Sequence, residues 1–226
     1  MPPAANLSPR ERWLLASVAG RRILDIGFAG QKGVVPGYFP HLRSKQPSVH
    51  LFGLDCNQEA VFARRQTGSM VGDAGALPVR PDSVDCVLMG EFLEHHIAIE
   101  SFLAEALRVL RPGGVLLVTT PNPLFANRMI RRWLMPRKRD LGGERNVSAA
   151  MGYHDHRILW DPLSLTHVIR QIGFDVDEVS ALGTWIPGLG RLIPRFRRSV
   201  LLDFWPANRL GYITCMKCRK RSGHDA

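Results

Sequence analysis

Five short apolar segments, separated by stretches with helical periodicity, organise the first half of this sequence. The segments read RRILDIG, VHLFGLD, SMVGDA, SVDCVLMG and GGVLLVTTPN, at residues 21–27, 49–55, 69–74, 83–90 and 113–122. Nearly continuous apolar strands that alternate with helices are typical of a parallel sheet covered on both faces. Because crossovers between parallel strands are right-handed, the sequence predicts an α/β fold with a doubly wound sheet.

Further helix and strand patterns lie at both ends of the chain. Ser8, followed by a proline, is typical of a helix start and places an N-terminal helix within residues 1–20. The pattern of residues 161–174 predicts another helix, and FDVDEVSAL at 174–182 predicts a strand. We expect a last strand within residues 209–220. The sequence therefore predicts a mostly parallel, seven-stranded, Rossmann-like sheet with an antiparallel edge strand.

Composition narrows the class of protein further. The chain has 226 residues, of which 45% are hydrophobic, so it can bury a core and we expect one domain over residues 1–226. No apolar run approaches the roughly 20 residues of a membrane-spanning helix, and the N-terminus lacks a secretory pattern. Four scattered cysteines fit a reducing compartment. We therefore expect a cytoplasmic protein.

Acidic residues and glycines follow the predicted strands at the edge where ligands of such sheets bind. Asp25 lies in the first strand, before a glycine-containing turn at residues 27–30, and Asp55, Asp73 and Glu91 follow the next three strands. The turn reads GFAGQK and does not match the G-x-G-x-x-G fingerprint of dinucleotide sites. An acid in the turn suits an ammonium group, and an acid after the second strand suits ribose hydroxyls. These residue types favour a nucleoside cofactor with an amino-acid end.

The sequence resembles the class I S-adenosylmethionine (SAM)-dependent methyltransferases. The matching motifs are ILDIGFAG, LFGLDCN, VGDAGALPVRPDSVDCVLMGEFLEHH, LRPGGVLLVTTPN and HRILWDPLSLTHVIRQIGF, in family order over roughly residues 20–180. The resemblance points to the branch of ubiquinone-biosynthesis-type O-methyltransferases and of methyltransferases in sugar and natural-product pathways. It implies methyl transfer with SAM as the cofactor.

The resemblance also implies a set of cofactor-binding residues. From the methionine end to the adenine end they are Asp25, Gly27, Phe28, Gly30, Glu91, Asp55, Cys56, Asp73 and Ala74. Asp55 would bind the ribose hydroxyls, and Asp73 with Ala74 would contact adenine. Ala29 and Gln31 stand where the family has glycines, so the shape of the turn departs from the family pattern.

Transfer to a hydroxyl needs a group that removes the hydroxyl proton, most often a histidine. The methyl group of SAM is already activated, so the protein otherwise supplies alignment and excludes water. By resemblance, His156 matches a histidine found just before the following helix, and we predict it as the base, with His154 as second candidate. His95 is a further candidate in the LEHH segment. The irregular segments 121–160 and 184–208 are expected to cover the acceptor site.

A metal site is not predicted. The His-Asp-His triplet at residues 154–156 could ligate a metal together with one more carboxylate. No further ligand is evident in the sequence, which disfavours a metal site at this triplet.

Basic segments point to the kind of partner. The chain carries a formal net charge of +10, and arginines are interleaved with Trp, Leu and Ile within residues 128–139 and 185–198. This mixture suits contact with an anionic membrane surface, or with a phosphate-bearing lipid or glycan. Nucleic acid is less favoured, because no recognised RNA-binding module is present. We expect a small-molecule, glycan or lipid acceptor and a peripheral membrane contact.

Two alternative functions stay open at this point. One keeps the fold and cofactor but transfers the methyl group to RNA or protein. The other is a non-catalytic module that keeps the SAM-binding fold as a scaffold, for which the altered turn at Ala29 and Gln31 is the sign.

Overall fold

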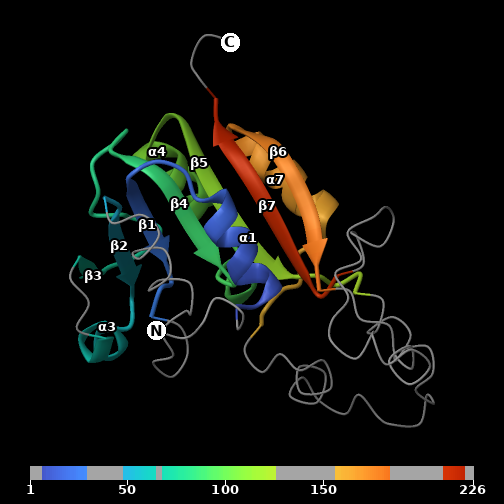
Figure 1. Cartoon of the computed structure of the whole chain (residues 1–226), viewed down its shortest axis with the longest axis horizontal. Helices are drawn as coiled ribbons and strands as arrows, with labels where there is room; N and C mark the ends of the chain where they lie inside the picture. The colour runs from blue at the N-terminus through green and yellow to red at the C-terminus, as the bar shows by residue number, and fades with distance from the viewer. Residues whose placement is uncertain (1–6, 30–47, 65–67, 126–155, 184–210, 222–226) are drawn as a thin grey trace.

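The computed structural model describes residues 7–29, 48–64, 68–125, 156–183 and 211–221 (Figure 1). In chain order the elements are α1 (Pro9–Ser17), β1 (Arg22–Ile26), β2 (His50–Asp55), α3 (Gln58–Arg64), β3 (Ser69–Val71), β4 (Val84–Gly90), the 3₁₀ helix η3 (Leu93–His95), α4 (Glu100–Val109), β5 (Leu110–Pro121), α7 (Pro162–Ile172), β6 (Phe174–Leu182) and β7 (Ile213–Lys220). The predicted strands are all present, as are the helices within residues 1–20 and 161–174, with bounds that differ by a few residues. Helices α3 and α4 separate β2 from β3 and β4 from β5, whereas a loop without a helix joins β3 to β4, and residues 30–47 between β1 and β2 lie outside the described residues.

Seven strands of the described residues form one sheet in the order β3-β2-β1-β4-β5-β7-β6. Strands β1 to β5 are parallel, and β7 runs antiparallel to both of its neighbours, β5 and β6. The doubly wound, mostly parallel sheet is therefore confirmed. The position of β7 differs from the expectation, because the antiparallel strand lies one place in from the edge and β6 is the outermost strand.

Helices cover both faces of the sheet. Figure 1 shows α1 in front of the central strands, α4 behind them, and α7 behind β7 and β6. One core cluster packs α4 and α7 against the sheet through residues such as Leu103 and Ile169, and the other packs α1 and α3 through Leu14 and Val61. Apolar burial on both faces explains why the central strands read as continuous apolar runs rather than alternating ones.

The helix ends follow from the local sequence. Ser8 accepts a hydrogen bond from the Glu11 amide, and the Glu11 carboxylate accepts one from the Ser8 amide, which makes a capping box at the start of α1. Asp161 caps α7 by accepting from the amides of Leu163 and Ser164. Gly173, with a φ of +121°, ends α7 directly before the start of β6.

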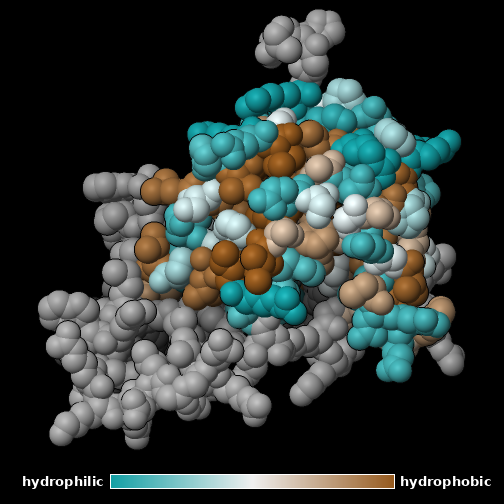
Figure 2. Space-filling model, turned by 180° about the vertical axis from the view of Figure 1, so that it is seen from behind, coloured by the Kyte–Doolittle hydropathy of each residue, from teal (hydrophilic) through white to brown (hydrophobic). Residues whose placement is uncertain are grey.

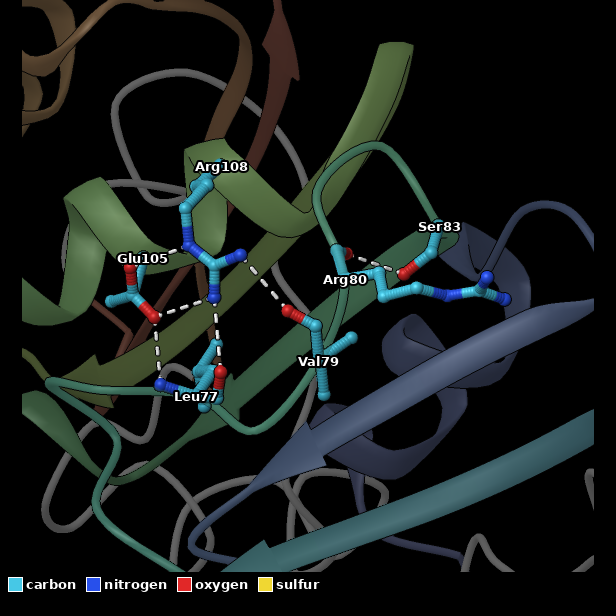
Figure 3. Close-up of polar contacts among 6 residues, drawn as sticks. All are labelled: Leu77, Val79, Arg80, Ser83, Glu105 and Arg108. Atoms are coloured by element: carbon cyan, nitrogen blue, oxygen red, sulfur yellow. Dashed lines mark hydrogen bonds and ion pairs between the residues drawn. The ribbon is translucent and has the colours of Figure 1, made fainter.

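An arginine on α4 fixes the long loop that follows β3. Arg108 donates to the carbonyls of Leu77 and Val79 over 3.0 and 2.9 Å and pairs with Glu105, whose carboxylate also accepts from the Leu77 amide (Figure 3). The hydrogen bonds from Arg108 lower the pKa of Glu105. The loop is thereby attached to α4, and the residues just after β3 are held at the edge of the sheet.

The face formed by α4 and α7 mixes polar and apolar side chains (Figure 2). Isolated apolar side chains such as Leu163 are exposed there, which is ordinary for a protein surface. Within the residues described, no helix is long and apolar enough to cross a membrane.

Substituting alanine for Gly53 tests how tightly β2 packs. A Cβ at this position would lie 2.5 Å from the ring of Phe28, so we expect Gly53→Ala to lower the free energy of unfolding by about 1–3 kcal/mol through overpacking. Chemical denaturation measures the change. If the clash with Phe28 is the cause, the substitution costs less in a Phe28→Ala background, which lacks the clashing ring atoms. An equal cost in both backgrounds would contradict this cause.

Candidate functional site

The turn after β1 brings a buried carboxylate and a glycine to the carboxyl end of the sheet. Asp25 is only 2% exposed, and Gly27 has a φ of +74° that favours glycine. A Cβ at Gly27 would lie 2.8 Å from the ring of Phe92, which follows β4. The Gly27 amide donates to the Leu54 carbonyl over 2.8 Å, so the turn is joined to the tip of β2.

Asp55 connects the tips of β1 and β2. Its Oδ2 accepts from the Ala29 amide at 3.1 Å and its Oδ1 from the Asn57 amide at 2.9 Å. Each carboxylate oxygen has a second lone-pair site, so Asp55 can still accept hydrogen bonds from two ligand hydroxyls. The carboxylate predicted to bind ribose therefore also holds the turn that carries Gly27.

The other residues predicted near β1 and β2 lie in different surroundings. The Phe28 ring is buried against Gly53 in the core, so its side chain packs beneath the sheet edge and only its backbone borders the turn. Cys56 is exposed just after β2. Gly30 and the departure at Gln31 lie outside the described residues.

The residues after β3 and β4 complete this edge. Asp73 is exposed and accepts from the Gly75 amide at 2.8 Å, in a turn that buries Ala74. Glu91 has a φ of +53°, an unusual conformation for a residue other than glycine, and its carboxylate is paired with Arg10 of α1. Strands β3, β2, β1 and β4 are neighbours in the sheet, so their carboxyl ends adjoin one another.

A second cluster lies beside this edge, where η3 follows β4. The ring of His156 lies 4.9 Å from that of His95, and its Nε2 is 3.9 Å from Oε1 of Glu94. Glu94 is fully buried, and burial raises its pKa to about 8, with the nearby charge of Glu91 adding to the effect. One ligand atom from each of the three residues lies within 4.8 Å of the others, so the cluster could hold a metal ion.

Hydrogen bonds fix His156 against η3. The amides of Arg157 and Ile158 donate to the Glu94 carbonyl over 2.8 and 3.2 Å, and the Trp160 indole donates to Leu93. His154 and most of the two expected cover segments lie outside the described residues, as do the basic segments. Glu94 lies in the LEHH segment but was not predicted as a site residue, because the periodicity of a short 3₁₀ helix does not reveal which side chain is buried.

Comparison with known proteins identifies the family of the segment from β1 to β5. A family model described as a methyltransferase domain matches residues 24–118, from β1 to β5. This segment belongs to the SAM-dependent methyltransferases. Among solved structures, a SAM-dependent methyltransferase of Thermotoga maritima, a possible histamine N-methyltransferase, has the same fold, with a TM-score of 0.62, 18% identity and coverage of 94% of this chain and 95% of that one.

Curated relatives of this methyltransferase domain act on different acceptors. The ubiquinone biosynthesis O-methyltransferase of Cupriavidus pinatubonensis is 28% identical over 193 residues, which cover 80% of this chain and 72% of that protein. The fatty-acid O-methyltransferase of Mycolicibacterium smegmatis is 34% identical over 49% of this chain and 40% of its own length. This chain spans between 25% and 47% of several such relatives.

The residues at the sheet edge of the methyltransferase domain fit SAM, the cofactor of the family. A carboxylate in β1 beside a positive-φ glycine suits the ammonium group of the methionine part, and Asp55 retains acceptor capacity for two hydroxyls. Gly27 has no Cβ, which lets the ring of Phe92 pack closely against the turn.

Proposed function

We propose that this protein transfers the methyl group of SAM to a hydroxyl of a small molecule, a sugar or a lipid-linked glycan. The observation that supports it is the position of His156, which is held against η3 beside the strand tips expected to bind the cofactor. A histidine at that place can take the proton of an acceptor hydroxyl as the methyl group arrives.

In this proposal each strand tip contacts a different part of the cofactor. Asp25, Gly27 and Gly30 surround its methionine end, and Glu91 lies close by. The ribose hydroxyls bind to Asp55, with Cys56 against the adenosine, and adenine is contacted by Asp73 and Ala74. His156 is the base, with His154 second, and the segments 121–160 and 184–208 cover the acceptor.

Binding of SAM is tested by calorimetry on the isolated protein. We expect one molecule of SAM per chain, because the strand tips form one continuous edge. Heat changes no larger than those of the buffer would contradict the proposed cofactor site.

The acceptor class is tested by incubating the protein with SAM carrying a labelled methyl group and a fractionated cell extract. We expect label in the lipid, glycan or small-molecule fraction, and none when the His156→Ala variant replaces the wild type. Ribonuclease pretreatment of the extract should leave the transfer unchanged. Loss of the transfer after ribonuclease, or label confined to protein, would contradict the proposed acceptor.

A further inference from the structure

The cluster of Glu94, His95 and His156 combines features that a base acting alone does not require. It contains one carboxylate and two imidazoles from two segments more than 60 positions apart in the chain. Such a donor set is typical of sites for divalent transition-metal ions, since imidazole nitrogen suits these ions better than it suits Mg²⁺ or Ca²⁺. The carboxylate, Glu94, is the ligand that the sequence did not reveal.

The two oxygens of Glu94 have different surroundings. Thr120, near the end of β5, donates to Oε2 over 3.2 Å. Oε1 is directed toward His156 and, among the described residues, has no hydrogen-bond partner although it is buried. A buried carboxylate oxygen without a donor is costly, whereas a metal ligand whose other oxygen is held by a neighbouring donor is a common arrangement.

The cluster is also rigid enough to be a site. His95 and Glu94 lie in the same 3₁₀ helix, and the Arg157 and Ile158 amides join the His156 segment to the Glu94 carbonyl. Ligands at about 2.1 Å from one ion lie about 3.0 Å apart in octahedral coordination and about 3.4 Å apart in tetrahedral coordination. The Glu94–His156 pair, at 3.9 Å, is close to the tetrahedral separation, and the widest pair, at up to 4.8 Å, needs modest side-chain rotation.

From these observations we propose that Glu94, His95 and His156 bind one divalent transition-metal cation at the acceptor side of the methyltransferase domain. Cation binding itself does not depend on the proposed function. The use of the cation in catalysis does depend on the proposed function, because it requires an acceptor hydroxyl. A hydroxyl bound to the cation would lose its proton more readily. In that case Nε2 of His156 would act as a ligand instead of as the base of the proposed function, and the proton released from the cation-bound hydroxyl would pass to solvent.

The test measures Mn²⁺ binding to the chelator-treated 226-residue chain without SAM or acceptor. The electron paramagnetic resonance signal of free Mn²⁺ falls as the ion binds, and we expect one ion per chain. Glu94→Gln and His156→Ala should each weaken binding at least tenfold, while His167→Ala, which removes an exposed histidine of α7, should leave it unchanged. Equal binding by the wild type and both cluster variants would overturn the site, as would a preference for Mg²⁺.

Two further measurements separate a lost ligand from a misfolded chain. Thr120→Val keeps all three ligands and should weaken Mn²⁺ binding by about 10- to 100-fold, because the donor that orients Glu94 is lost. Mn²⁺ should also raise the unfolding temperature of the wild type but not of His156→Ala. SAM calorimetry on the chelator-treated wild type then distinguishes the two proposals: normal SAM binding without saturable Mn²⁺ binding overturns the metal site alone.

Discussion

Replacing Asp55 with alanine is expected to weaken SAM binding by about 10- to 150-fold, which corresponds to about 1.5–3 kcal/mol. The loss has two physical sources. The ribose hydroxyls lose a charged acceptor, and the Ala29 amide loses the carboxylate that holds the turn after β1. Isothermal titration calorimetry with SAM measures the change in affinity.

The matched control for this variant is Asp175→Ala. Asp175 is an exposed carboxylate near the start of β6, where it pairs with Arg221, so its removal should leave SAM affinity unchanged. Thermal unfolding of both variants shows whether the fold is retained. An Asp55→Ala protein that binds SAM as tightly as the wild type would remove Asp55 from the cofactor site.

The second large effect is expected for His156→Ala. Turnover with a hydroxyl acceptor should fall by about 100- to 10,000-fold, the usual contribution of a positioned acid–base group. Affinity for SAM should stay near the wild-type value, because His156 belongs to the acceptor side of the proposed site. Steady-state rates at saturating SAM, combined with calorimetry, separate the two quantities.

His167→Ala is the control for a lost histidine elsewhere in the fold, since this residue is exposed on α7. It should retain full turnover. Full activity in His156→Ala would exclude His156 both as the base and as a required metal ligand. A parallel loss of SAM affinity would instead show that His156 supports the cofactor site.

The parallel core could be predicted from the sequence because its strands are buried on both faces and therefore read as unbroken apolar runs. The position of β7 in the sheet could not be predicted from the sequence. Its apolar residues, such as Met216 and Cys218, are buried between β5 and β6, but periodicity reports burial and not which neighbours a strand has. Strand order is set by long-range pairing, which a local pattern does not contain.

The residues of the candidate site likewise include some that could be predicted from the sequence and some that could not. Asp25, Asp55 and Asp73 could be placed because each follows or ends an apolar run, and the carboxyl ends of parallel strands share one edge. Phe28 also follows an apolar run, but its ring packs into the space that Gly53, which has no side chain, leaves in the neighbouring strand β2. Glu94 needed the structure, since its burial depends on Thr120 and on the His156 segment, which are distant in the chain.

The insertion of β7 between β5 and β6 has a consequence for synthesis on the ribosome. Until residues 213–220 have left the exit tunnel, β6 has no hydrogen-bonded neighbour in the sheet and the outer side of β5 remains open. Unpaired strand edges invite association with other chains. The nascent protein must therefore stay unassembled along this flank until β7 has been synthesised and has emerged, and a chain truncated before β7 would lose two strands of the sheet rather than one.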